Sequence, residues 1–138
     1  MAQGHIEKLL TLPEVKIAAF ADISEASIAR TQTRHGAAVA DVPTSSDYNA
    51  LPQAVKPNAV LIATPHTLHY PMAIDCLEAD CHVLLEKPMV NKVSEAHALL
   101  KKIDETNVPI NGLRTIEPTE AAWESAASGG QTTAVNRS

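Results

Sequence analysis

The chain has 138 residues, a length that fits one globular domain and argues against a large two-domain enzyme within this polypeptide. Hydrophobic residues account for 45% of the sequence and charged residues for 20%, an ordinary balance for a protein that builds its own core. Only 3% of the residues are aromatic, so the core must consist of Ala, Val, Leu and Ile. Such side chains favour helices packed closely on strands, and we expect an α/β fold.

Charge and hydropathy argue against several classes of partner. The formal net charge of −5 disfavours nucleic acid, because phosphate neutralisation needs clustered Lys and Arg. No apolar run reaches the roughly 20 residues of a bilayer span, and no basic flank precedes an apolar stretch at the start. We therefore expect a cytoplasmic protein without a membrane partner. Cys76 and Cys81 are too far apart for a Cys-x-x-Cys pair, and we expect two ordinary buried or half-buried thiols.

The first half of the chain alternates between predicted helices and strands. Apolar spacing and turn residues predict helices at 4–12, 25–35 and 48–55, strands at 15–21 and 37–39, and a loop at 41–46. The second of these helices has Ser24 as its expected N-cap. Gly36 stands where a helix end favours a left-handed residue.

The second half continues the alternation and contains the clearest strand. Residues 59–63 are apolar on both faces, which predicts an interior strand of a sheet covered on both sides. Further elements are predicted as a helix at 68–79, a strand at 82–85, a helix capped by Ser94 that ends before Asn107, and a strand at 108–111. This order implies a doubly wound parallel sheet with right-handed connections. Residues 113–138 lack an apolar period, and we expect an irregular or disordered tail.

Ligands of doubly wound sheets bind at the carboxyl ends of the strands, where this chain places several polar residues. Asp22 follows the predicted strand at 15–21. An acidic residue at that place can accept hydrogen bonds from both hydroxyls of an adenosine ribose, which favours NAD over NADP. The alternative is that Asp22 only turns the chain into the next helix, and the sequence leaves both interpretations open.

Residues 64–69, Thr-Pro-His-Thr-Leu-His, form the second candidate, between the strand at 59–63 and the next helix. His66 and His69 could share a helix face, but no Cys, Asp or Glu nearby completes a metal set, so we predict no metal. The backbone N–H groups and hydroxyls of this segment could instead meet a ligand. The alternative is a plain helix cap by Thr64 or Thr67.

Glu86 and Lys87, which follow the apolar strand at 82–85, form the third candidate. A lysine held at a strand end beside a carboxylate can donate hydrogen bonds to a substrate hydroxyl and a cofactor ribose. The alternative is an exposed ion pair of little energetic value.

Together these segments resemble a known family. Residues 64–69, a helix, residues 82–88 (His-Val-Leu-Leu-Glu-Lys-Pro) and a further helix resemble the amino-terminal half of the glucose-fructose oxidoreductase and inositol dehydrogenase (Gfo/Idh/MocA) family. The resemblance covers residues 1–112 and implies an NAD(P)-binding Rossmann domain that transfers a hydride to or from sugars, polyols or related alcohols. The family joins this domain to a carboxyl-terminal substrate and oligomerisation domain, which implies that a full-length form can be a homo-oligomer.

The resemblance also implies roles for particular residues. Lys87 is the expected catalytic residue, because the family uses it to orient or polarise the reacting hydroxyl. NAD is expected rather than NADP, because the charge of Asp22 would repel a 2′-phosphate and no Arg follows it directly. Ala2 stands at the third small position of the family's phosphate-binding motif, Gly-x-Gly-x-x-Gly/Ala. The expected cofactor-binding residues are Ala2, Asp22, Thr64, Pro65, His66, His69, Glu86 and Lys87.

The chain also departs from the family pattern. The first strand and the first two glycines of Gly-x-Gly-x-x-Gly would precede Met1, and the second domain would follow Asn111. We therefore expect a doubly wound, Rossmann-like sheet that lacks its first strand, in an incomplete domain at 1–112, with no second domain. Two functions stay open, an NAD(P)-dependent oxidoreductase and a non-catalytic, truncated nucleotide-binding or interaction module.

Overall fold

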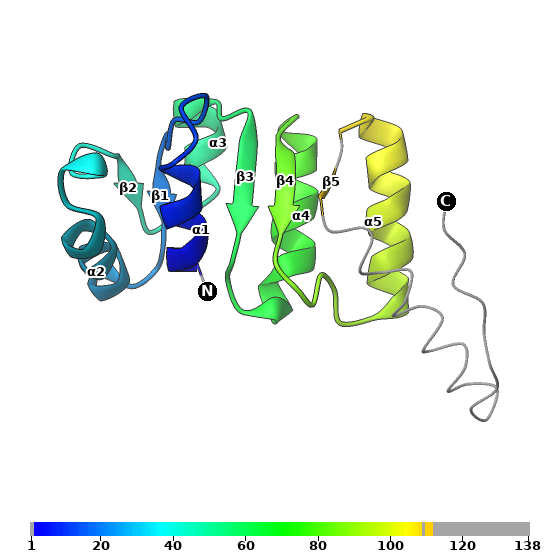
Figure 1. Cartoon of the computed structure of the whole chain (residues 1–138). Coiled ribbons are helices and arrows are strands. Elements are labelled where there is room, and N and C mark those ends of the chain that lie inside the picture. The colour runs from blue at the N-terminus through cyan, green and yellow to red at the C-terminus, as the bar shows by residue number, and fades with distance from the viewer. Residues whose placement is uncertain (1, 109, 112–138) are drawn as a thin grey trace. The chain divides into compact units, whose positions relative to one another are not determined.

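The computed structural model describes residues 2–108 and 110–111, which belong to two compact units, Met1–Pro57 and Asn58–Ser138. All strand pairs in the described residues are parallel, as Figure 1 shows. The first unit contains the sheet β1-β2, and the second contains the sheet β3-β4-β5. Parallel strands alternating with helices confirm the predicted α/β, Rossmann-like fold.

The first unit has short strands and three α-helices. Its elements are α1 (Ala2–Leu9), β1 (Phe20–Ala21), α2 (Glu25–His35), the 3-10 helix η1 (Gly36–Ala38), β2 (Thr44–Ser45) and α3 (Ala50–Val55). The strand predicted at 15–21 is therefore reduced to two paired residues. The pairing is this short because β2 offers only Thr44 and Ser45 as partners to β1.

Two predictions for the first unit are wrong. Residues 37–39 are not a strand, because the chain coils into η1 and the N–H of Val39 donates to the carbonyl of Gly36 at 3.1 Å. The segment at 41–46 is not only loop, because it contains β2. Its pairing rests on backbone groups, such as the Phe20 N–H that donates to the Pro43 carbonyl at 2.9 Å. Backbone pairing of this kind cannot be predicted from the amino-acid composition of a polar segment.

The second unit follows the predicted order closely. Its elements are β3 (Ala59–Ile62), the 3-10 helix η2 (His66–Leu68), α4 (His69–Glu78), β4 (His82–Leu85), α5 (Val93–Thr106) and β5 (Ile110–Asn111). The bounds of β4 are those predicted, and β3 is one residue shorter than predicted. In the register of these strands Ile62 lies beside Leu85, so β3 and β4 end together at one edge of the sheet.

The core of the second unit lies where α4 meets β3, β4 and α5. Leu77 of α4 and Leu99 of α5 are almost completely buried. Burial alternates along β4, since Val83 and Leu85 are buried whereas Leu84 is 38% exposed. Only Ile62 of β3 is buried, so the expected burial of both faces of this strand is not found.

Helix ends agree with the sequence in one unit and differ in the other. Ser24 caps α2 as predicted, since its side chain accepts from the Ser27 N–H at 3.3 Å, and Gly36 ends α2 with φ +54°. Ser94 does not cap α5, because the helix already begins at Val93. None of the described helices has the length and apolar character that a membrane span requires.

Candidate functional site

Two loops leave the second unit's sheet at the same edge. One follows β3 and begins with Ala63 and Thr64, and the other follows β4 and begins with Glu86. The ladder continues one step into the second loop, because the Glu86 N–H donates to the Ile62 carbonyl at 3.1 Å. The segments at 64–69 and 86–88, which the sequence singled out separately, therefore start from neighbouring positions of parallel strands (Figure 1).

His69 connects the two loops. It is the first residue of α4, and its side chain is 1% exposed. Its Nδ1 lies 2.8 Å from the carbonyl oxygen of Pro88, and its Nε2 lies 2.9 Å from the carbonyl oxygen of Thr64. Both ring nitrogens therefore face backbone carbonyls of this chain.

The loop after β3 is held at two further points. The Thr64 hydroxyl donates to Sδ of Met72 at 3.4 Å, and Asn91 Nδ2 donates to the His66 carbonyl at 3.2 Å. The interpretation of Thr64 or Thr67 as a helix cap is wrong, because α4 follows Leu68 without any side-chain cap. No pattern in the sequence indicated that Met72 and Asn91 contact this loop.

Glu86 and Lys87 differ in their surroundings. Glu86 is half-buried, and its carboxylate accepts a hydrogen bond from the Lys87 backbone N–H at 3.1 Å. The Lys87 side chain is exposed, and within the described part of the chain its ammonium has no hydrogen-bond or ion-pair partner. The peptide bond between Lys87 and Pro88 is cis. The ammonium group is thus available to a ligand at the strand ends.

The first unit contains the other candidate residues, Asp22 and Ala2. Asp22 directly follows β1 and is exposed, and its Oδ1 accepts from the Ser24 N–H at 2.8 Å. This bond is the turn that the sequence offered as an alternative, and it leaves Oδ2 outside that hydrogen bond. Ala2 is the first residue of α1.

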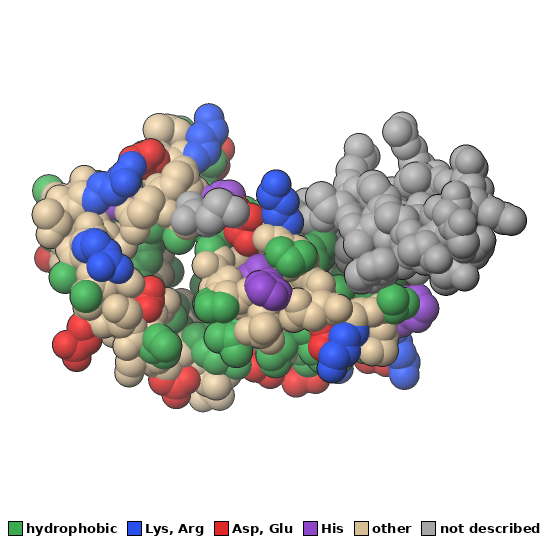
Figure 2. Space-filling model, turned by 90° about the horizontal axis from the view of Figure 1, so that it is seen from below, with side chains coloured by type: hydrophobic (Ala, Val, Ile, Leu, Met, Phe, Trp, Pro, Cys, Tyr) green, Lys and Arg blue, Asp and Glu red, His purple; other side chains and the backbone are tan. Residues whose placement is uncertain are grey.

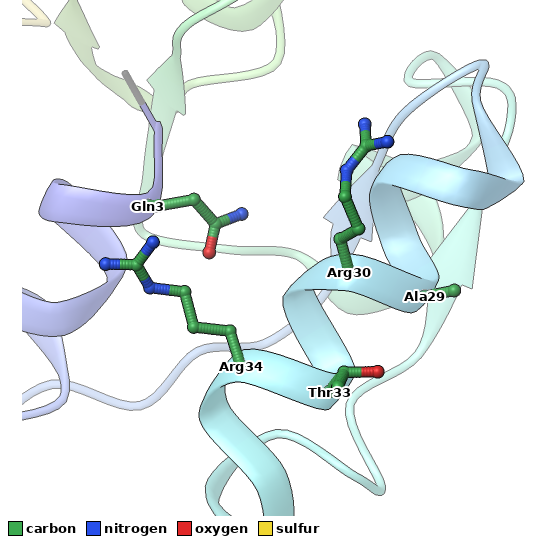
Figure 3. A pocket seen from close by; sticks show the side chains of 5 residues that line it. All are labelled: Gln3, Ala29, Arg30, Thr33 and Arg34. Atoms are coloured by element: carbon green, nitrogen blue, oxygen red, sulfur yellow. The ribbon is translucent and has the colours of Figure 1, made fainter.

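A hollow of about 460 Å³ lies between α1 and α2 of the first unit and was not predicted (Figure 3). Two arginines one turn apart on α2 form part of its lining. Arg34 is paired with Glu7 at 2.7 Å, whereas Arg30 donates to the Ser27 hydroxyl at 2.9 Å. Gln3 is bonded to other side chains of α2, so the polar groups here serve mainly to hold the two helices together.

Figure 2 views the molecule from the side toward which β3 and β4 point in Figure 1, and histidine, basic and apolar side chains are visible there. In residues 2–108 and 110–111, no three His, Cys, Asp or Glu side chains are grouped as a metal site requires. The candidate ligand groups in the described residues are therefore a carboxylate, an ammonium, hydroxyls and backbone amides, which suit an organic ligand with hydroxyl groups.

Residues 1–111 match the family described as an oxidoreductase family with an NAD-binding Rossmann fold, GFO_IDH_MocA. This match covers most of the chain. The chain belongs to the Gfo/Idh/MocA family. The family match confirms the resemblance that the segments at 64–69 and 82–88 indicated.

Individual members of the Gfo/Idh/MocA family agree with this assignment. An inositol 2-dehydrogenase of Rubrobacter xylanophilus is 26% identical over 134 residues, which cover 94% of this chain and 37% of that protein. A scyllo-inositol 2-dehydrogenase (NADP(+)) of Bacillus subtilis is 39% identical over 49 residues, 36% of this chain and 14% of that protein. The chain thus spans well under half the length of these curated relatives.

Solved structures of the family show the same fold. GenD2 from gentamicin A biosynthesis, crystallised in complex with NAD, matches with a TM-score of 0.69 and 28% identity. The match covers 80% of this chain and 30% of GenD2.

The predicted domain limit at residue 112 and the tail at 113–138 lie outside the described residues.

Proposed function

We propose that this chain forms the cofactor-binding part of an NAD-dependent oxidoreductase that acts on a sugar, a polyol or a related alcohol. Family membership and the inositol dehydrogenases among the relatives support the reaction and the substrate class. The observation that carries the proposal most directly is the exposed Lys87 ammonium at the end of β4, beside the loop that follows β3.

Each of the two units contains groups that are chemically suited to a part of a dinucleotide. Asp22 would accept hydrogen bonds from the hydroxyls of the adenosine ribose, and Ala2 would begin the helix that faces the phosphates. Thr64, Pro65 and His66 would line the nicotinamide side, with Glu86 and Lys87 as further contacts. These assignments extend the family resemblance to this chain's own residues.

Oxidation of an alcohol removes a hydride from carbon and a proton from the hydroxyl oxygen. NAD supplies the hydride acceptor when it is bound. Lys87 Nζ would donate a hydrogen bond to the hydroxyl oxygen and hold that oxygen in place. Negative charge grows on this oxygen as its proton passes to water or another base, so a nearby ammonium stabilises the transition state more than the ground state. A cytoplasmic location and a homo-oligomeric full-length form stay predictions.

The proposal includes a preference for NAD over NADP, although one relative is named for NADP(+). The carboxylate of Asp22 would repel a 2′-phosphate, and its place directly after β1 supports the ribose contact. The alternative, a nucleotide-binding module without catalysis, differs from this proposal in turnover and not in cofactor binding.

The test is titration calorimetry of the 138-residue chain with NAD and NADP, followed by an NADH absorbance assay with a panel of inositols and sugars. NAD should bind about tenfold or more tightly than NADP, a difference of about 1.4 kcal/mol. Asp22→Asn keeps an oxygen for the Ser24 N–H and should reduce this preference, whereas Asp104→Asn on α5 should leave it unchanged. Tighter NADP binding overturns the preference, NADH formation with a member of the panel supports the oxidoreductase, and failure to bind either cofactor overturns the proposed function.

A further inference from the structure

The buried ring of His69 makes two polar contacts and no others are needed to satisfy it. Its nitrogens lie 2.8 Å from the Pro88 carbonyl oxygen and 2.9 Å from the Thr64 carbonyl oxygen. Both distances are in the range of hydrogen bonds to a carbonyl. With 1% of the side chain exposed, no face of the ring is open to a ligand.

The chemistry of the two acceptors restricts the ring. A carbonyl oxygen can only accept, and a neutral imidazole has one N–H and one lone pair. The ring therefore donates to at least one of the two carbonyls in either tautomer, and it lies between both of them.

The two carbonyls belong to the loops that carry the candidate site. Thr64 lies two residues after β3, and Pro88 directly follows Lys87. The ring thus fixes the separation of these loops beyond the point where the ladder ends at Glu86. The other described link between the loops, from Asn91 to the His66 carbonyl, is exposed and open to competition from water.

We infer that His69 is a positioning residue, whose ring lies between the carbonyls of Thr64 and Pro88 and so holds the Lys87 segment against the loop after β3. This role rests on the proposed function and replaces a direct contact between His69 and the cofactor. A buried connection matters here because a displacement of about 1 Å between reacting groups can lower a rate by about a hundredfold. The role acts through backbone position, since the ring itself cannot reach a ligand.

The first test is nuclear magnetic resonance of the unaltered 138-residue chain with ¹⁵N-labelled histidine. A slowly exchanging ring N–H signal is expected, and it should be absent in His69→Gln. The matched control is His82→Gln, because His82 is an exposed histidine on β4 outside the candidate site. A ring N–H of His69 that exchanges as fast as that of the exposed His82 overturns the buried contact.

The second test compares the binding of NAD and of ADP-ribose, which lacks the nicotinamide. Gln presents a single nitrogen in place of the two ring nitrogens, so His69→Gln should release one loop. Its affinity for NAD should fall about tenfold and its affinity for ADP-ribose by less than about twofold, whereas a general loss of folding would weaken both equally. His82→Gln should change neither affinity.

The outcomes separate this inference from the proposed function. If the unaltered chain binds both ligands and His69→Gln weakens them equally, the positioning role is wrong while the proposed cofactor site stands. If the unaltered chain binds neither ligand, the proposed function is wrong, and the N–H signals alone decide whether His69 holds the two loops. The same signals decide the question if far-UV circular dichroism shows that His69→Gln does not fold.

Discussion

Lys87 and Cys76 are two ionisable residues that differ in their exposure to solvent. The Lys87 ammonium is exposed at a strand end, whereas the Cys76 thiol of α4 is 3% exposed. Exposure leaves the lysine able to bind a ligand, and burial removes the cysteine from thiol chemistry at neutral pH. The expectation that both cysteines are ordinary thiols agrees with their free, buried state.

Replacing Lys87 by Ala should affect turnover more than cofactor binding. In a form of the protein that oxidises substrate, we expect kcat to fall about a hundredfold or more, because the lost hydrogen bond is strongest in the transition state. The dissociation constant of NAD should change by less than about threefold. Steady-state kinetics and calorimetry measure both quantities, and Lys92→Ala, at an exposed lysine before α5, is the control. Near-normal kcat in Lys87→Ala would assign Lys87 to the protein surface.

Stability should depend on pH through Cys76. Burial, and then the neighbouring Cys81 and Asp75, raises the pKa of the Cys76 thiol from 9.0 to about 11. The folded state holds this proton more tightly than the unfolded state. The contribution of the Cys76 thiol to the free energy of unfolding is therefore complete below pH 9 and is lost as the pH rises toward 11. The loss is on the order of 2 kcal/mol.

Urea unfolding between pH 8 and pH 11 measures this contribution. Cys76→Ala should lower the stability at pH 8, because it leaves a small cavity, but should reduce its decline above pH 9. Cys81→Ala should keep most of the decline. Equal slopes for the unaltered chain and Cys76→Ala would contradict the assignment to this thiol.

At the scale of elements, helix ends were predicted well where a side chain or a glycine decides them. Ser24 and Gly36 delimit α2 as expected, because a capping hydroxyl and a positive φ are local requirements. The start of α5 was not predicted, since Lys92 precedes it without a capping side chain. There the carboxylate of Glu95 accepts the Asn91 N–H at 3.0 Å instead.

Two glycines of the first unit should respond to Ala with opposite signs. Gly36 has φ +54°, and a Cβ there would meet no atom within 4 Å, so the cost of Gly36→Ala is one of backbone conformation. We expect a loss of about 1–3 kcal/mol. Gly4 lies inside α1 with equally open space, and Gly4→Ala should add about 0.5–1 kcal/mol. Urea unfolding of both variants is the measurement, and a stabilising Gly36→Ala would contradict this account.

At the scale of the whole molecule, the buried apolar side chains are distributed unevenly. Of the buried hydrophobic residues that the structure describes, Ile6 and Val39 belong to Met1–Pro57 and all the others to Asn58–Ser138. The first unit's strands are also only two residues long. Burial supplies most of the free energy of folding, so the two units should differ in local stability.

Hydrogen exchange followed by mass spectrometry should show this difference. After correction for intrinsic rates, amides of α1 and α2 should exchange faster than those of α4 and α5, by about tenfold or more for each 1.4 kcal/mol of difference in opening free energy. Peptides of β3 and β4 are the internal reference for the second unit. Equal protection of the helices in both units would contradict this expectation.

The sequence by itself determined the fold class, the order of the α-helices and strands in the second unit, and the family. The strands at 59–62 and 82–85 and the helices after them have apolar patterns that a single segment carries, and the segments at 64–69 and 86–88 keep a fixed distance from those strands. Local patterns of this kind can be recognised without knowing which other segments pack against them. The sequence also supplied the side chains of the candidate site, whose roles stay proposals.

Only the tertiary structure decided what those segments contact. The pairing of β2 with β1 uses backbone carbonyls and N–H groups, and the two contacts of His69 use backbone carbonyls. Every residue has the carbonyl and every residue except proline has the N–H, so the residue type does not predict these contacts. The partners of His69 lie five and 19 residues away along the chain. The histidine was visible in the sequence as a polar residue near a strand end, but its burial and the direction of its ring follow from how α4 packs against the two loops.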